Sequence, residues 1–349
     1  MVTRIGLDLG YANITLSDSL AEIYREPAVA LVHKEPKADS RRTISIGSAA
    51  LDAGADGANV PDGVLVRPFK NGLLFDSTLT EGIIAGAVKT VQPTDAIRCV
   101  IGVPSDLLPK QEKALFGMLE GAGVGECFSV NRAIAALVGA GYSPTMSVIS
   151  VNVGASATEV AVLHGGSIVL STREKVGGED FDKAVKQYIL EQGDVNVSLS
   201  VARAIKERLG SVWKGRPPES IDIEGTLSLT GNRVRMTVAS EDVVGVFEKP
   251  LHKLLMAVAD TVKKMPLELV EPVFKNGIVL TGGGALLFGL GTMMERVLGI
   301  PVTVPDDAID CVAKGLSRIN TFIPMRTRQN NKNITSQVAK FYESKKSAK

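Results

Sequence analysis

The chain contains the same strand–turn–strand pattern twice. Residues 148–163 read VISVNVGASATEVAVL, in which alternating apolar residues on either side of a small-residue turn are typical of two buried strands. Residues 4–16, RIGLDLGYANITL, align with this stretch without a gap. Three pairs of residues then match: Asp8 with Asn152, Gly10 with Gly154, and Ala12 with Ser156. The period is far too long for a solenoid, so the repeat predicts two related domain halves.

Each turn has the composition of a phosphate-binding loop. Gly154 lets the backbone approach a ligand closely, and successive N–H groups in such a turn point into one concavity that suits an anion. The same pattern is also typical of an ordinary hairpin with a small-residue turn. The two readings stay open at this point.

A third glycine-rich stretch lies late in the chain. Residues 277–290, GIVLTGGGALLFGL, place three successive glycines between an apolar strand and an expected helix over 291–298. The backbone can pass under a nucleotide at such a place, and the dipole of the helix favours negative charge there. The sequence contains no GxxxxGK[ST], so a P-loop is excluded.

Composition limits the class of protein. The chain has 349 residues, 45% of them hydrophobic, and a net charge of +1. This length and hydrophobic content are enough for two or more domains of ordinary size. Its N-terminus does not resemble a signal peptide, and no run approaches the ~18 apolar residues of a membrane span. The three cysteines and three histidines are scattered, which favours reduced thiols over disulfides or a zinc site. We expect a cytoplasmic globular protein.

Strands alternate with helices along the first half, which predicts an α/β sheet covered on both faces. The segment 25–60 is expected to be a loop-rich small subdomain, and a turn is expected at 70–72. The other expected elements of this half are a helix from Ser77, a strand over 99–103, a helix over 109–122, a strand over 127–130 and a helix over 133–140.

Strands and helices are also expected along the second half of the chain. A strand over 167–171 is followed by a turn over 176–182 and a helix to about residue 191. The remaining expectations are a helix over 198–212, a β-hairpin over 221–238 with its turn at Gly231, a long helix over 241–265 stopped by Pro266, and a strand over 300–304.

Taken together, these motifs resemble the MreB family of bacterial actins, within the ATPase superfamily of actins, sugar kinases and heat-shock chaperones. The resemblance runs to about residue 320. Its carrying stretches are GLDLGYAN at 6–13, RPFKNGLLFDSTLTE at 67–81, IGVPS at 101–105, AALVGAG at 135–141, GASATEVAVL at 154–163, VGGEDFD at 176–182, IKERLGS at 205–211, the glycine stretch at 277–290 and GIPVTVPDDAIDCVAKG at 299–315.

The resemblance implies an actin-like α/β fold with two related domains, each a mixed sheet flanked by helices, and a nucleotide in the cleft between them. Domain I would comprise 1–145 plus 315–330, with a small subdomain at about 30–65. Domain II would comprise 146–314, with a small subdomain at about 183–242. A basic tail, 331–349, would follow.

The resemblance also implies that ATP or ADP binds with Mg²⁺. Asp8 would hold the Mg²⁺ through water, because this hard cation prefers carboxylate and water oxygens. Lys206 and Glu207 would face the adenosine. The implied nucleotide residues are Asp8, Gly10, Tyr11, Ala12, Asn13, Gly154, Ala155, Ser156, Thr158, Gly178, Lys206, Glu207, Gly282, Gly283, Gly284 and Ala285.

Two positions depart from the family at the step of hydrolysis. Asn152 stands where the family has an aspartate, and Arg132 stands where it has the glutamate that orients the attacking water. An amide lacks the charge that organises Mg²⁺, and an arginine accepts neither a proton nor a hydrogen bond from water. We expect ATP binding with weak or absent hydrolysis and with Arg132 turned to a phosphate, unless Glu126 or Glu159 substitutes for the missing acid. Tyr11, which replaces a small threonine, would either crowd the phosphates or pack in the core.

The C-terminal tail is basic and carries apolar residues at helical spacing, namely Ile334, Val338, Phe341 and Tyr342. It would either dock on a partner, an anionic membrane or the protein itself, or remain a solvated terminus. Nucleic-acid binding is not expected, since aromatic residues are few. Direct membrane binding is unsupported, because neither the N-terminus nor the 91–98 loop resembles the membrane-binding segments of many MreB proteins.

The leading functional expectation is an actin-like cytoskeletal protein that self-associates into filaments for cell shape or intracellular organisation. One alternative is a monomeric actin-fold kinase or chaperone-like ATPase, although no substrate-binding domain follows and the RPFKNG stretch is MreB-like. Another is a non-polymerising paralogue that regulates an authentic MreB.

Overall fold

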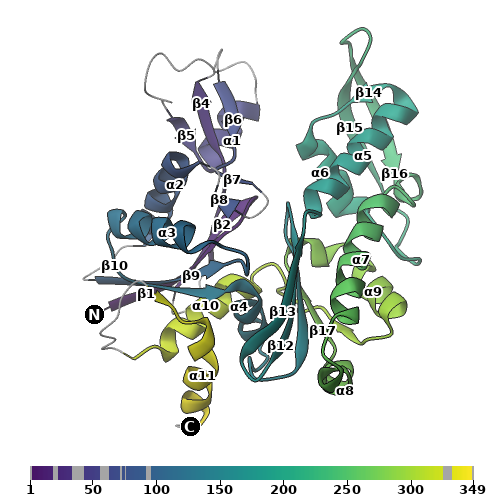
Figure 1. Cartoon of the computed structure of the whole chain (residues 1–349). Coiled ribbons are helices and arrows are strands. Elements are labelled where there is room, and N and C mark those ends of the chain that lie inside the picture. The colour runs from purple at the N-terminus through teal and green to yellow at the C-terminus, as the bar shows by residue number, and fades with distance from the viewer. Residues whose placement is uncertain are drawn as a thin grey trace. The chain divides into compact units, whose positions relative to one another are not determined.

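The chain folds into two compact units (Figure 1). The computed structural model describes residues 2–18, 23–33, 43–55, 63–70, 73–74, 76–91, 96–324 and 332–347. The first unit comprises Met1–Met146, Leu163–Val169 and Asp310–Lys349. The second comprises Ser147–Val162 and Leu170–Ile309.

A six-stranded mixed sheet of order β19-β10-β9-β1-β2-β3 forms the centre of the first unit. Its middle strand, β1 (Val2–Leu9), is antiparallel to β2 (Asn13–Asp18) and parallel to β9 (Ala96–Val103). Ile5 and Leu7 of β1 are fully buried, as the alternating apolar pattern predicts for a central strand. The outer strands are β3 (Ile23–Pro27), antiparallel to β2, and then β10 (Val124–Asn131) and β19 (Lys332–Asn333), which continue parallel to β9.

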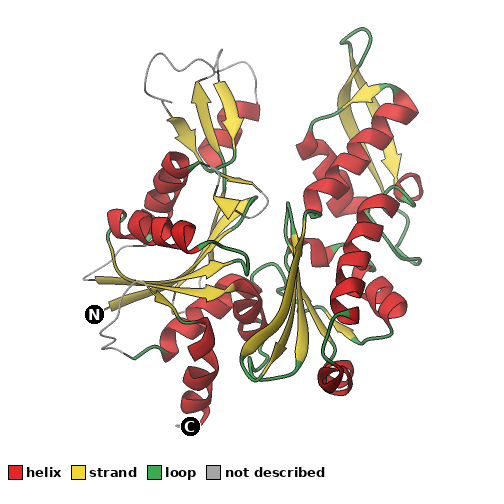
Figure 2. Ribbon diagram, in the orientation of Figure 1, coloured by secondary structure: helices red, strands yellow, loops and turns green. Residues whose placement is uncertain are grey.

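Helices cover both faces of this sheet (Figure 2). On one face lie α2 (Ser77–Thr90), which begins where the Asp76 carboxylate accepts the N–H of Leu79, and α3 (Pro109–Gly121). On the other lie α4 (Arg132–Gly139) and α10 (Cys311–Phe322), which pack against each other. The predicted domain boundary after residue 314 falls inside α10, because this helix belongs entirely to the first unit.

The segment expected to be rich in loops contains regular structure. A three-stranded sheet of order β5-β4-β6 is covered by α1 (Ser48–Ala55), and Val29, Leu31 and Ala50 form its small core. Its strands are β4 (Ala30–His33), β5 (Thr43–Ile46) and β6 (Gly63–Val66). A two-stranded ribbon follows, made of β7 (Phe69–Lys70) and β8 (Leu73–Leu74). The turn residues expected at 71–72 lie outside the described residues.

The second unit repeats the connectivity of the first. Its five-stranded sheet has the order β13-β12-β11-β17-β18, with β17 parallel to both β11 and β18. By its place in the sheet, strand β11 corresponds to β1, β12 to β2, and β17 to β9. This correspondence confirms the two related halves predicted from the repeated hairpin. The bounds are β11 (Val148–Val153), β12 (Thr158–His164), β13 (Ser167–Glu174), β17 (Ile278–Thr281) and β18 (Val302–Thr303).

A second small sheet, of order β14-β15-β16, belongs to this unit, and the predicted turn at Gly231 joins two of its strands. The helix expected from Glu241 begins only at Glu248, because a 3-10 turn, η1 (Ser240–Val243), is followed by Gly245 in a left-handed conformation. The bounds are β14 (Val195–Asn196), β15 (Ser220–Leu227), β16 (Arg233–Ala239), α5 (Gly178–Gly193), α6 (Leu199–Leu209), α7 (Glu248–Lys263), α8 (Leu267–Asn276) and α9 (Leu290–Leu298).

The C-terminal segment docks on the first unit. After β19 come a 3-10 turn, η3 (Thr335–Gln337), and α11 (Val338–Ser347). Ile334 and Val338 are fully buried, and the ring of Tyr342 meets that of Phe322 edge-on with centroids 5.4 Å apart. Of the alternatives for this tail, the structure selects docking on the protein itself, because its apolar stripe finds a partner in α10. Arg326 and Arg328 lie outside the described residues.

The three cysteines are buried and free of disulfides, as expected. Burial raises the pKa of the Cys99 thiol, and it raises that of Cys127 to about 12. In the described part of the chain, no helix is long and apolar enough to cross a membrane.

Candidate functional site

One backbone hydrogen bond closes the turn between β1 and β2. The N–H of Gly10 donates to the carbonyl of Asn13 over 2.9 Å. A Cβ at Gly10 would lie 2.7 Å from that oxygen, so any larger residue there would force the turn to shift. Residues 10–13 are half-buried, which leaves part of this backbone accessible to a ligand.

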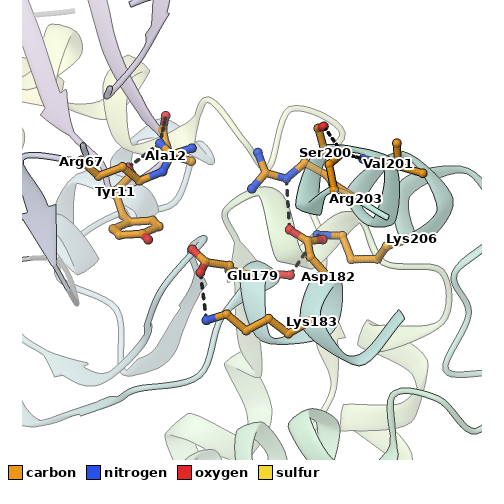
Figure 3. Close-up of polar contacts among 12 residues, drawn as sticks. Tyr11, Ala12, Arg67, Glu179, Asp182, Lys183, Ser200, Val201, Arg203 and Lys206 are labelled. Atoms are coloured by element: carbon orange, nitrogen blue, oxygen red, sulfur yellow. Dashed lines mark hydrogen bonds and ion pairs between the residues drawn. The ribbon is translucent and has the colours of Figure 1, made fainter. Parts of the chain in front are cut away.

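Arg67 holds the same turn by its backbone carbonyls (Figure 3). Its Nη1 donates to the carbonyls of Tyr11 and Ala12, both at 3.2 Å, and to that of Ala28 at 3.4 Å. Its guanidinium carbon also lies 5.2 Å from the centroid of the Tyr11 ring, a cation–π distance. The ring of Tyr11 is therefore engaged by protein. Sequence reasoning missed this role of Arg67, whose only signal was its place at the start of the RPFKNG stretch.

Asp8, at the carboxyl end of β1, forms an ion pair with Arg132. The Nε of Arg132 lies 2.8 Å from Oδ1 of Asp8, and its Nη2 donates to the carbonyl of Leu9. The side chains are 11% and 22% exposed, respectively. Arg132 is the first residue of α4, whose start is set by the Asn131 side chain accepting the N–H of Ala133. A cation thus lies against the carboxylate that the sequence analysis assigned to Mg²⁺.

The two acids considered as substitutes for the missing glutamate are both paired with arginines. Glu126 pairs with the buried Arg98, and Glu159 lies 3.9 Å from Arg173. Both carboxylates therefore have a cationic side chain beside them. The structure therefore gives no support to either one as the acid that orients water.

The turn between β11 and β12 repeats the geometry of the first turn. The N–H of Gly154 donates to the carbonyl of Ala157 over 3.0 Å, the counterpart of the Gly10–Asn13 bond. Residues 154–157, which include the predicted Ala155 and Ser156, are half-buried. The carbonyls of Gly154 and Ala155 accept the N–H groups of Gly178 and Glu179, the first residues of α5, over 2.9 and 2.8 Å. The positive end of the α5 dipole therefore lies directly behind this turn.

Thr158 supports the turn from within the protein. It is fully buried, and its hydroxyl donates to the carbonyl of Val176 over 2.8 Å. The family resemblance implies that Thr158 contacts the nucleotide. Its burial assigns it instead to the scaffold that links β12 to the segment before α5.

A buried carboxylate joins α5 to α6 (Figure 3). Asp182 is fully buried, with the Nζ of Lys206 2.6 Å from its Oδ1 and the Nε of Arg203 3.1 Å from its Oδ2. The Lys206 contact is an ion pair without hydrogen-bond alignment, and Lys206 donates a hydrogen bond to the carbonyl of Gly178. The Lys206 ammonium is thus held beside the second turn, while Glu207 is exposed. The role of Asp182 was missed, since its only sequence signal was its place in the VGGEDFD stretch.

The three-glycine loop packs against the end of β11. Gly282 adopts φ +85°, and a Cβ there would lie 2.5 Å from the Val153 carbonyl oxygen and 2.8 Å from Oδ1 of Asn152. Asn152 and Gly282 are therefore immediate neighbours within the second unit. Gly283, Gly284 and Ala285 belong to a 3-10 turn, η2 (Gly283–Leu286), and the next helix begins only at Leu290. The helix expected over 291–298 is therefore confirmed, and a 3-10 turn that was not predicted precedes it.

A cavity of about 700 Å³ lies next to this loop in the second unit. Its lining includes Trp213, Phe288 and Arg296, and the guanidinium carbon of Arg296 lies 5.4 Å from the Trp213 ring centroid. Of the predicted nucleotide residues, it includes Ala285 alone. The cavity therefore does not mark the predicted site.

The side chains of Asp8 in the first unit and of Asn152 in the second unit each suit Mg²⁺ poorly. The carboxylate of Asp8 is neutralised by Arg132, and Asn152 offers a neutral amide where the family resemblance implies a carboxylate. Magnesium prefers ionised carboxylates and water. Among the residues described, no three His, Cys, Asp or Glu side chains group in a way that could hold a metal ion. Each unit thus carries its share of the predicted nucleotide residues, without a good set of ligands for the predicted metal.

Comparison with known proteins identifies the relatives of the chain. Residues 2–327 match the protein family described as MreB/Mbl protein. The chain is 28% identical over 329 residues to the cell shape-determining protein MreB of Escherichia coli K12, covering 92% of this chain and 94% of that one. It is 27% identical over 319 residues to the cell shape-determining protein Mbl of Bacillus subtilis, covering 89% and 93%.

Solved structures are similar over the same length. A crystal structure of MreB5 of Spiroplasma citri bound to AMPPNP has a TM-score of 0.84 at 23% identity, covering 92% of this chain and 96% of the other. The structure described as the MamK double helical filament has a TM-score of 0.78 at 22% identity, covering 93% and 100%. These likenesses establish the actin-like fold that was predicted from the sequence.

Proposed function

Because the chain belongs to the MreB/Mbl family, we propose that it is a bacterial actin-like cytoskeletal protein that binds ATP or ADP and assembles into filaments. The relatives named above are cell shape-determining proteins, and the structural neighbours include a nucleotide complex and a filament. Cell shape or intracellular organisation is accordingly the role that we propose. Its site of action would be the cytoplasm, where the three free cysteines stay reduced.

The observation that carries this proposal is the pair of matching glycine turns. Gly10 and Gly154 close turns of the same geometry at the same place in the two sheets. Turn N–H groups form anion-binding concavities, and the dipole of α5 adds positive potential behind the second turn. Nucleotide binding therefore explains a turn that occurs twice with this geometry better than an ordinary hairpin does.

The proposed nucleotide contacts follow from these placements. In the first unit they are Asp8, with its partner Arg132, and the turn at residues 10–13. In the second unit they are Gly154 to Ser156, Gly178, Lys206, Glu207 and the glycine loop from Gly282 to Ala285. Thr158 is excluded from this set because it is buried.

Hydrolysis is proposed to be weak or absent. Arg132 accepts no hydrogen bond from water, and Asn152 adds no charge to organise the reacting groups. Glu126 and Glu159 are both engaged by arginines. The loss of these acids also favours the second candidate function, a paralogue that regulates an authentic MreB without polymerising.

Electron microscopy of the purified protein with ATP, with ADP and without nucleotide separates the two candidates. We expect filaments with ATP, because the relatives that share this fold include a nucleotide complex and a filament. Light scattering over a series of protein concentrations measures assembly in solution under the same three conditions. Persistent monomers at high concentration in all three conditions would remove the filament proposal and leave the regulatory one.

A further inference from the structure

We propose that this chain binds its nucleotide without a divalent cation, because the Arg132 guanidinium neutralises the Asp8 carboxylate that a cation would otherwise have to offset. The inference rests on the proposed nucleotide binding and concerns what removes the repulsion between the Asp8 carboxylate and the phosphates. It starts from a disagreement between the metal that the family resemblance implies and the side chains present.

The charge balance at Asp8 is the first argument. A carboxylate next to a di- or triphosphate repels it, and a bridging Mg²⁺ ordinarily offsets this repulsion. Here the Nε of Arg132 lies 2.8 Å from Oδ1 of Asp8, so the pair has no net charge. The phosphates therefore meet a neutral pair, and a metal is not needed to screen the carboxylate.

The second argument is competition for the same oxygen. A Mg²⁺ organised by Asp8 through water would have to lie close to the guanidinium, and two cations repel each other strongly at a site that is only partly solvated. Asp8 and Arg132 are 22% and 11% exposed, so water screens them incompletely. The ion pair thus weakens any metal held at Asp8.

The position of Arg132 is built into the fold. Its Nη2 donates to the Leu9 carbonyl, and α4 holds its backbone. The preceding Asn131 is anchored at both its side chain and its backbone. Its Nδ2 donates to Oγ of Ser105 over 2.8 Å, and its N–H donates to Oγ1 of Thr335 over 2.9 Å. The guanidinium is therefore held against β1 by contacts from several elements of the first unit.

The residues around the turn of the second unit support the same inference. Asn152 stands at the position matching Asp8 in the repeat, and its amide carries no charge. A nucleotide bound there would find backbone N–H groups and the Lys206 ammonium, which the ion pair with Asp182 holds beside the turn. At the two matching hairpin positions, one carboxylate is paired with Arg132 and the other residue is a neutral amide, which is a poor ligand set for Mg²⁺.

Nucleotide affinity with and without metal tests the proposal. The dissociation constants of ADP and AMPPNP would be measured by isothermal titration calorimetry in excess MgCl₂ and in excess EDTA. For the natural protein we expect the two values to agree within about threefold, less than 1 kcal/mol. A loss of affinity of about tenfold or more in EDTA would overturn the inference while leaving the proposed nucleotide binding intact. Absence of binding in both buffers would overturn both.

A charge-reversal variant sharpens the test. Arg132→Glu restores the family's acid and leaves Asp8 without its cation, so EDTA should then weaken binding about tenfold or more. Arg235→Glu makes the same change in net charge at an exposed ion pair with Glu224 and should leave the metal response unchanged. An Arg132→Glu protein that binds equally in both buffers would also contradict the proposal. If this variant does not fold, the comparison of buffers with the natural protein still decides.

Discussion

Arg132 Nε lies 2.8 Å from Asp8 Oδ1, which joins the side chain that replaces the family's water-orienting glutamate to the carboxylate expected to organise Mg²⁺. The substitution at residue 132 thus does more than remove an acid. It also neutralises the one carboxylate that remains at the two matching hairpin positions, since Asn152 occupies the other. We therefore expect this one contact to affect both metal binding and hydrolysis.

Restoring both acids should restore hydrolysis. In a single-turnover phosphate-release assay with ATP and Mg²⁺, Arg132→Glu combined with Asn152→Asp should exceed the natural protein by about a hundredfold, the lower end of what a positioned base contributes. Arg235→Glu serves as the control for charge. Equal and substantial rates in the natural protein and the double variant would show that another group orients the water.

Substituting alanine for the glycines that close the two turns should affect stability and ADP binding to different extents, because the space around each glycine differs. A Cβ would lie 2.7 Å from a carbonyl oxygen at Gly10 but 3.1 Å at Gly154. Gly10→Ala should therefore cost stability, by about 1–3 kcal/mol, and weaken ADP binding more than Gly154→Ala does. Gly82→Ala in α2, where nothing lies within 4 Å, should stabilise the protein by about 0.5–1 kcal/mol. Urea unfolding and calorimetry measure both effects, and equal responses at all three sites would contradict this ranking.

Docking of the C-terminal segment should contribute to stability. Ile334 is 1% exposed, so Ile334→Ala should lower the free energy of unfolding by about 2–4 kcal/mol. Ser336→Ala, at an exposed position of the same segment, should change it by less than about 0.5 kcal/mol. Urea titrations followed by circular dichroism compare the two variants. A solvated terminus would instead leave both unchanged.

The buried thiols should be unreactive in the folded protein. Burial raises the pKa of Cys127 to about 12, so hardly any thiolate forms at pH 8. An aromatic disulfide reagent should label Cys99, Cys127 and Cys311 only after unfolding, because all three are buried. Rapid labelling of the native protein would show that these sites open.

The raised pKa values also predict a dependence of stability on pH. In the unfolded chain a thiol loses its proton near pH ~8.5, whereas the folded state keeps it protonated to a higher pH. The unfolded state then binds fewer protons, and the free energy of unfolding should fall as the pH rises from about 8.5. Urea midpoints at pH 8 and pH 10 measure this loss, which should shrink in a Cys127→Ser variant.

Short-range patterns predicted much of the fold. The hairpins around Gly10 and Gly154 and the turn at Gly231 follow from apolar alternation and turn glycines, which act over a few residues. The late start of α7 and the 3-10 turn at Gly283 were not predicted. Before α7, Gly245 at positive φ ended the helical spacing, and at the glycine loop Gly282 at positive φ introduced a turn that no local pattern indicated.

The sequence by itself determined the duplication of the glycine turn, the family resemblance and the two departures at Arg132 and Asn152, because these are properties of residue type and spacing. Only the tertiary structure decided which charges meet. The Arg132–Asp8 contact joins residues 124 positions apart, and the docking of Ile334 depends on strand pairing with β10. No local pattern specifies such pairings, since they arise when sheet order and helix packing bring distant residues together.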